Sequence, residues 1–221
     1  VNMYYTLDGS EPDSSSLVYK GQLVITDSGT LKVIAMRSGW LPSKIQSFHF
    51  EKASLRFTYA KLDERPDKRY EAKFDSSLID LAKGSPDPSD GNYLGYYGNN
   101  MNAMIGFDTP VMINSVTVSC LVKHNSMILS PVLAELWISD DSGKPIQRIA
   151  SVSSQNKTFV KEGFKQKIIL KFPKQKIKYL KLKLVNPGKT PATHESRGAK
   201  SWIFIDEIVP DLIQRVSGSS G

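Results

Sequence analysis

The sequence has little of several features that would assign a protein to a particular class. It has one cysteine, Cys120, in 221 residues, so neither an intrachain disulfide nor a cysteine-based zinc site can form. No apolar run approaches the roughly 20 residues that span a bilayer. The first residues also lack the charged-then-apolar pattern of a signal peptide. We therefore expect no membrane span and a buried, structural thiol at Cys120.

Catalytic motifs are missing as well. The three histidines, His49, His124 and His194, are scattered without metal-ligand spacing, and no nucleophile elbow or phosphate-binding glycine loop occurs. A glycosidase holds two carboxyl groups about 5 to 10 Å apart. The adjacent pair 140–141 belongs to a predicted hairpin turn, and the pair 206–207 belongs to a strand, where neighbours face opposite ways. The sequence predicts no enzymatic activity within this chain.

What is present is typical of a soluble globular chain, with 40% hydrophobic and 23% charged residues. A length of 221 residues favours two domains. The net charge of +7 points to an anionic partner. Eight lysines lie between Lys165 and Lys183, but Leu180, Leu182 and Leu184 alternate with lysines there, as in a strand with one solvated face. Without stacking aromatics beside the cations we expect no nucleic acid, and acidic polysaccharide stays open.

Residues 1–52 contain short strand patterns separated by turn residues, without a helical period. The segments YYTLDGSEP, SLVYKGQLVI and TLKVIAMRSGWLPS, within residues 4–50, resemble the small C-terminal domain of chitobiases and β-hexosaminidases. That resemblance implies an immunoglobulin/fibronectin-like β-sandwich, here N-terminally truncated because the chain opens directly on a strand. We expect this domain to be structural rather than chemical.

Residues 57–212 carry a second set of period-two runs: AMIGFDTP, NSVTVSCLV, LAELWISDDSG, KQKIILKF and YLKLKLVN. Residues 75–83 are expected to form one short helical turn. Three blocks, beginning SLIDLAKGSPDPSDG, LAELWISDDSG and SWIFIDEIV, resemble the discoidin-like module of bacterial family 20 hexosaminidases. That module is related to coagulation-factor type C domains and family 32 carbohydrate-binding modules. The resemblance implies an all-β fold with a galactose-binding-type jelly roll, followed by a flexible tail at 213–221.

The two resemblances imply a non-catalytic carbohydrate-binding accessory region of a larger secreted glycan-processing protein, such as a bacterial β-N-acetylhexosaminidase. Its partners would be an oligosaccharide or polysaccharide and the catalytic domain of the same parent chain. Its location would be secreted, periplasmic or at the cell surface. The alternative is a structural or protein-contact module without its own ligand. An exposed apolar patch at residues 127–129 would support this alternative.

A structural calcium is a further implication of the resemblance. Related modules hold the ion between an early Asp-containing loop and a Glu near the C-terminal strand, and Asp80 and Glu207 occupy those positions. The loop 83–91 adds Ser85 and Asp87, and calcium prefers six to eight such oxygen ligands. Leu81 stands where the family has glycine, and an Asp-rich loop that is simply solvated is the competing interpretation.

Three loops are expected to bind sugar, because an aromatic ring stacks on a pyranose while polar side chains reach its hydroxyls. They are residues 92–99, 123–131 and 186–202. The candidate ligand-binding residues are Tyr93, Tyr96, Tyr97, His124, Asn125, His194 and Arg197. The tyrosine run is equally compatible with strand packing, and Trp202 is expected in the core. The related modules have a Ser-Trp pair where this chain has Ser126-Met127, which removes one ring.

Overall fold

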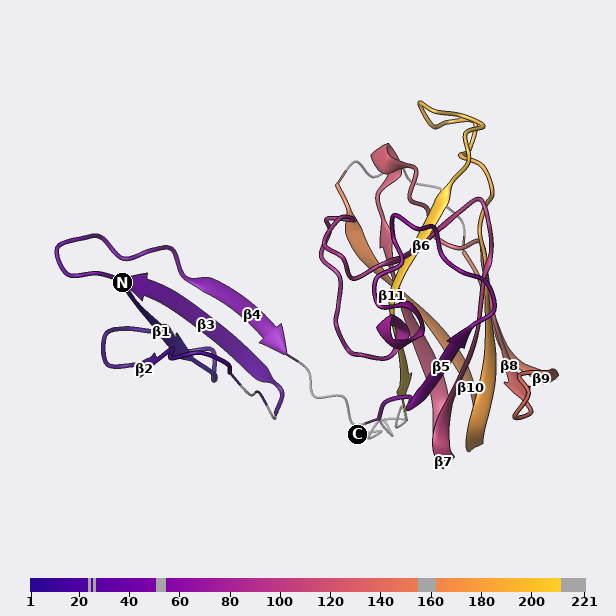
Figure 1. Cartoon of the computed structure of the whole chain (residues 1–221), viewed down its shortest axis with the longest axis horizontal. Helices are drawn as coiled ribbons and strands as arrows, with labels where there is room; N and C mark the ends of the chain where they lie inside the picture. Colours follow the sequence, from indigo (N-terminus) through magenta and orange to yellow (C-terminus); the bar gives the residue numbers. More distant parts are fainter. Residues whose placement is uncertain (24, 26, 51–54, 155–161, 212–221) are drawn as a thin grey trace, which may run out of the picture. The chain divides into compact units, whose positions relative to one another are not determined.

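A computed structural model describes residues 1–211 except 24, 26, 51–54 and 155–161. The chain divides into two compact units, Val1–Ser54 and Leu55–Gly221, and each is described by itself (Figure 1). Every described element is a β-strand or a short 3-10 helix, which confirms the all-β prediction. No described helix has the length and apolarity that crossing a membrane needs. The predicted tail at 213–221 lies outside the described residues.

The first unit is one antiparallel sheet in the order β2-β1-β3-β4. Its strands are β1 (Asn2–Thr6), β2 (Leu17–Val18), β3 (Gly29–Met36) and β4 (Gln46–Phe50). The predicted turn after β1 is present: the Asp8 carboxylate accepts the Ser10 amide at 3.0 Å, and Gly9 has φ +83°. The described residues form one layer of the sandwich expected for this unit, and their buried apolar residues are Pro12, Leu31 and Ile34.

The described residues of the second unit form seven strands and two 3-10 helices. The shorter strands are β5 (Tyr59–Leu62), β6 (Leu94–Tyr97), β8 (Leu133–Ser139), β9 (Pro145–Ser153) and β11 (Trp202–Asp211). The two long strands are β7 (Met101–Val122) and β10 (Phe164–Val185). The 3-10 helices are η1 (Phe74–Leu78), inside the segment where a helical turn was predicted, and η2 (His124–Ser126).

The two long strands make the sandwich. The sequence predicted each of them as two short strands, but β7 and β10 are continuous over 22 residues and pair with each other along most of that length. Register shifts in their ladder mark the place where both strands bend, near Pro110 and Pro173. One half of the pair carries β5, β8 and β9, and the other half carries β11 and β6.

These two layers enclose one core. On β10, Leu180, Leu182 and Leu184 are fully buried, as their alternation with lysines predicted. They pack in the same cluster as Val118 on the other half of β7 and Ile205 on β11. An antiparallel two-layer sandwich around a single core is the architecture that the jelly-roll prediction requires. Cys120 is buried in this core, and its burial raises the pKa of the thiol to about 12.

A second, smaller apolar cluster lies apart from that core. It contains Tyr93, Leu121, Ile128, Trp202 and Phe204. Parts of the Tyr70, Tyr97 and Met127 side chains cover it. Because its members come from four loops or strands, this aromatic cluster fixes where the loops of that end of the sandwich lie.

Candidate functional site

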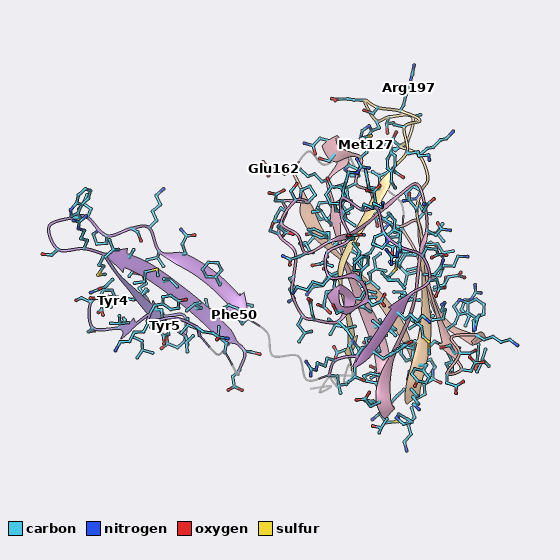
Figure 2. All side chains as sticks on the ribbon, in the orientation of Figure 1. Tyr4, Tyr5, Phe50, Met127, Glu162 and Arg197 are labelled. Atoms are coloured by element: carbon cyan, nitrogen blue, oxygen red, sulfur yellow. The ribbon has the colours of Figure 1, made fainter. Side chains whose placement is uncertain are left out.

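The loops before β11 and after β7 are joined by backbone hydrogen bonds. The Trp202 amide donates to the Met127 carbonyl at 2.8 Å, and the Leu129 amide donates to the Trp202 carbonyl at 2.9 Å. Met127 adopts a left-handed conformation, with φ 58°, where η2 ends. Figure 2 shows Met127 and Arg197 at the same end of the second unit. We call this surface, formed by residues 97–98, 123–129 and 186–202, the loop end.

A histidine connects the two loops from inside. The Nε2 atom of His194 lies 2.6 Å from the His124 carbonyl oxygen, and its Nδ1 atom accepts the Ser196 amide at 2.9 Å. Since Nδ1 accepts a hydrogen bond, the proton of a neutral ring lies on Nε2, which donates to the carbonyl. His124 and His194 are both buried, so these two candidate residues shape the loop end rather than offer their rings to a ligand.

The third predicted loop joins the same end. The Gly98 amide donates to the Ser201 carbonyl at 2.8 Å, and the Asn186 side-chain amide donates to the Tyr96 carbonyl at 3.0 Å. Asn186 is buried, so these bonds lie inside the protein, where they resist exchange with water. The three loops that the sequence singled out are thus assembled into one surface.

Two of the three candidate tyrosines are not available to a ligand. Tyr93 and Tyr96 are 1% and 2% exposed, and burial raises the pKa of both phenols. The Tyr93 hydroxyl donates to the Ser85 carbonyl, and the Tyr96 hydroxyl donates to the Glu64 carbonyl at 3.3 Å. The prediction that these rings form a sugar platform is therefore wrong for Tyr93 and Tyr96, because both pack inward.

Tyr97 is half-buried and lies against Trp202, with ring centroids 4.6 Å apart and planes inclined by 31°. Trp202 is itself 7% exposed, in agreement with its predicted place in the core. The Lys200 ammonium lies 5.7 Å from the Tyr97 ring centroid. The accessible ring of the loop end is thus a tyrosine, stacked on a buried tryptophan and flanked by a cation.

A fourth segment, which the sequence did not single out, also reaches this cluster. The Arg69 guanidinium lies 4.9 Å from the Trp202 ring centroid, and Asp67 holds it through two hydrogen bonds of 2.9 and 3.1 Å. The neighbouring Tyr70 ring meets Trp202 edge-on at 5.3 Å. No pattern in the charged stretch 61–71 indicates these contacts, because they depend on a residue more than 130 positions away.

The exposed side chains at and beside the loop end include an amide and several cations, together with the carboxylate of Glu195. Asn125, Arg197, Lys200 and Arg69 are exposed. Ile128 and Leu129 are buried, and Met127 is half-buried against the aromatic cluster. The apolar patch expected of a protein-contact module at residues 127–129 is therefore not a feature of this described surface. A half-exposed ring among amide and guanidinium donors suits a polyhydroxylated ligand.

The predicted calcium residues fall into two groups. Glu207 is 1% exposed and both of its carboxylate oxygens lack a hydrogen-bond partner among the described residues. Burial, and then the charge of Asp80, raise the pKa of Glu207 to about 8; the Leu81 and Ile208 amides lie near the carboxylate without forming a well-aligned hydrogen bond to it, and they offset only part of this. Leu81 has φ 63°, a left-handed conformation that favours glycine. A buried, unpartnered carboxylate beside a second one fits a hard cation.

Ser85 and Asp87 serve a different purpose in this structure. The Ser85 hydroxyl accepts the Asp87 amide at 3.1 Å, and the Asp87 carboxylate accepts the Ser89 amide at 2.9 Å. These are local turn interactions on an exposed loop. Among the described residues no group of three or more acidic, histidine or cysteine side chains converges as a metal site would require, so any further oxygens would come from backbone carbonyls.

The carboxylates of β11 do not form a catalytic pair. Asp206 is fully buried and pairs with Lys165, and it also accepts the Gly84 amide at 2.8 Å. Glu207 meets the Asp80 loop instead. The two adjacent side chains thus lie in different environments, as the alternation along a strand predicts.

Comparison with known proteins adds family and fold information. A family model described as Fn3 associated matches residues 1–50. No curated protein matches the chain in sequence. Among solved structures, the chain is similar to the family 32 carbohydrate-binding module (CBM32) of AlyQ in complex with 4,5-unsaturated mannuronic acid, at 12% identity and a TM-score of 0.41. That alignment covers 70% of this chain and 94% of the other.

Two further structures show the same kind of likeness. CpGH89CBM32-5 of Clostridium perfringens, in complex with GalNAc-β-1,3-galactose, is 15% identical, with a TM-score of 0.43 and coverage of 69% and 94% of the two chains. A GH29 fucosidase of Ruminococcus gnavus, in complex with fucose, is 10% identical, with a TM-score of 0.42. The alignment covers 71% of this chain and 25% of the fucosidase. At these identities the likeness is one of fold.

Proposed function

We propose that the second unit is a non-catalytic carbohydrate-binding module that binds a glycan at the loop end. The observation that carries this proposal is the convergence of three separate loops on one half-exposed ring, Tyr97, with Asn125 and Arg197 exposed on the same surface. Stacking on Tyr97 would orient a pyranose ring, while the amide and guanidinium groups would donate to its oxygens. Glycans are also the ligands named for the three solved structures above, but the proposal rests on this chain's own loops.

The same proposal places the chain as an accessory region of a larger secreted, periplasmic or cell-surface protein that processes glycans, such as a bacterial β-N-acetylhexosaminidase. Support comes from the sequence blocks that resemble the C-terminal region of these enzymes, in the same domain order. The module would then hold the parent catalytic domain near its substrate, and the hydrolytic carboxylates would belong to that domain.

A structural calcium is part of the proposal. Asp80 and Glu207 would supply carboxylate oxygens, and backbone carbonyls of the loop around Leu81 would complete the coordination. The ion would neutralise the buried Glu207 carboxylate and brace the loop against β11. No catalytic role is assigned to it.

The test is a glycan-array screen of the whole chain with and without a chelator, followed by titration of each hit. We expect Tyr97→Ala and Arg197→Ala each to weaken binding about tenfold or more, because each removes a stacking or hydrogen-bonding group. Matched controls are Tyr19→Ala and Arg37→Ala in the first unit, which should leave the affinity within twofold. A folded chain that binds no glycan, or hits that the loop-end variants leave unchanged, would refute the proposal.

A further inference from the structure

Strand β10 carries a run of exposed lysines on its solvent side, which follows the strand around its bend near Pro173. Its inward positions are apolar and buried, including Ile168, Leu170 and Ile177. We call five of these exposed lysines the lysine stripe: Lys167, Lys171, Lys174, Lys176 and Lys178. The first two lie before the bend and the other three at or after it, and the exposed Ile169 and Pro173 stand among them. The strand runs in orange through the second unit in Figure 1.

The lysines on either side of this stripe are neutralised. Lys165 forms an ion pair with the buried Asp206, and Lys181 pairs with Asp63. Among the described residues, none of the five stripe lysines forms an ion pair within 4.0 Å. The strand therefore has paired charges near its two ends and unpaired positive charge along its middle.

The neighbouring strand adds one exposed carboxylate near the stripe: Asp108 lies in the part of β7 opposite Lys178, between the partners of Ile177 and Tyr179. In the β7 register, Lys167 faces Ser119, Lys171 faces Ser115, and Lys176 faces Met112. Further acidic residues occur one strand away from β7, on β11, where Glu207 is buried and Asp211 is exposed. A row of like charges at this spacing repels itself, and a polyanion that replaces the counterions relieves this repulsion.

We propose that the lysine stripe binds a linear acidic polysaccharide through its repeated carboxylate or sulfate groups. This goes beyond the glycan site proposed above, since it uses a different surface and a different kind of contact. A polysaccharide suits the stripe better than a single-stranded nucleic acid, whose bases stack on open aromatic rings. The ring at the end of the stripe, Tyr179, meets Tyr59 edge-on at 6.0 Å, and the Lys178 ammonium lies 5.0 Å from its centroid.

A simpler role for the same lysines is protection of an edge. The first half of β10 has β7 as its paired neighbour, whereas β8 pairs only with the second half, from Leu180 to Val185. Lysines on such an edge discourage pairing with another chain. That role predicts aggregation when the lysines are removed and no effect on polyanion binding, so the two roles can be separated.

The probe is sodium polygalacturonate, with pullulan as the neutral reference polymer, titrated against the whole chain at 20 and 200 mM salt. The test variant replaces Lys171, Lys174, Lys176 and Lys178 by Gln. The control variant replaces Lys20, Lys44, Lys61 and Lys83, which are also exposed, and so removes the same charge elsewhere. Unfolding midpoints of both variants are measured to verify that each is folded.

We expect binding to polygalacturonate but not to pullulan, with at least a tenfold loss at the higher salt. The stripe variant should lose at least thirtyfold and the control variant less than threefold, while Tyr97→Ala should have no effect. Equal losses in the two lysine variants would overturn the proposal, because total charge would then explain the binding. So would an unchanged affinity in an aggregating stripe variant, or preferential binding of duplex DNA offered as a competitor.

Discussion

The two units of this chain use the same alternating sequence pattern with opposite results. In the second unit the inward side chains of β7, β10 and β11 are almost fully buried. In the first unit most apolar side chains on the sheet stay exposed to some degree, including Met3 at 42%, Leu17 at 59% and Phe48 at 50%. The two units differ in their number of layers. In the second unit, strands of 22 residues bend back, so that their two halves cover a common inner face. In the first unit, the described strands have two to eight residues and make a single sheet. Alternation specifies a buried face only where a second layer exists.

The largest test of this comparison is a large-to-small substitution in each unit. Leu182→Ala removes a fully buried side chain between two layers and should cost about 3 kcal/mol of unfolding free energy. Leu31→Ala, at 9% exposure in a single sheet that can relax, should cost about 1 kcal/mol. Hydrogen exchange of the whole chain in increasing urea, resolved by peptide, reports each unit separately. Equal costs would show that the first unit has a core comparable with that of the second.

A second test concerns the buried ion pair of the second unit. Lys165→Met leaves the fully buried Asp206 carboxylate without its cation, and its remaining partner is the Gly84 amide. An uncompensated buried charge should cost about 3 kcal/mol. Lys44→Met, at an exposed position of the first unit, should change stability by less than about 0.5 kcal/mol. The double variant Lys165→Met/Asp206→Asn should recover part of the lost stability. If it is as destabilised as Lys165→Met alone, the unpaired carboxylate is not the cause of the loss.

A third test is a pH dependence that, between pH 5 and 8, should be confined to the second unit. Glu207 has a folded pKa raised to about 8 from 4.5, so the folded state retains a proton that the unfolded state releases. The resulting stabilisation is complete below about pH 4.5 and is lost as the pH rises to 8. We expect the second unit to lose about 3 kcal/mol between pH 5 and 8, the value that linkage gives for this shift. In the first unit, hydrogen bonds from Ser10 and Ser15 lower the pKa values of Asp8 and Asp13, so these groups change the stability of that unit only at acid pH.

The same measurement at pH 8 with 2 mM calcium tests the proposed ion. Calcium should restore the stability that ionised Glu207 removes, and Glu207→Gln should abolish both the pH dependence and the calcium effect. Asp87→Asn is the matched control, because that carboxylate caps a local turn. Stabilisation by calcium that persists in Glu207→Gln would place the ion elsewhere.

Much of the second unit could be predicted from its sequence. The segments LAELWIS and YLKLKLV appear as β8 and the end of β10, and the leucines that alternate with lysines are buried. The sequence named the three candidate loops, and the structure joins them into one surface. The continuity of β7 and β10 was not predicted, because Pro110 and Pro173 look like breaks, whereas the structure uses them at a bend where ladder pairing is already irregular.

The individual site residues were harder to predict than the loops that carry them. The run Tyr93, Tyr96 and Tyr97 has no period that separates a ring on the surface from a ring inside, and only Tyr97 stays accessible. Arg69 was missed because its contact with Trp202 joins segments far apart in the chain. Glu207 was singled out on the resemblance alone, and its lack of hydrogen-bond partners depends on how the Asp80 loop lies against β11.

The all-β class, the strand positions in β8 and β10 and the lysine face follow from local physics: residue alternation, turn residues and the solvation of charge act over a few positions. Which tyrosine reaches solvent, which lysines find a carboxylate and which loops share a surface depend on contacts between residues 41 to 133 positions apart. Burial is a property of the assembled layers, so only the tertiary structure could assign those roles.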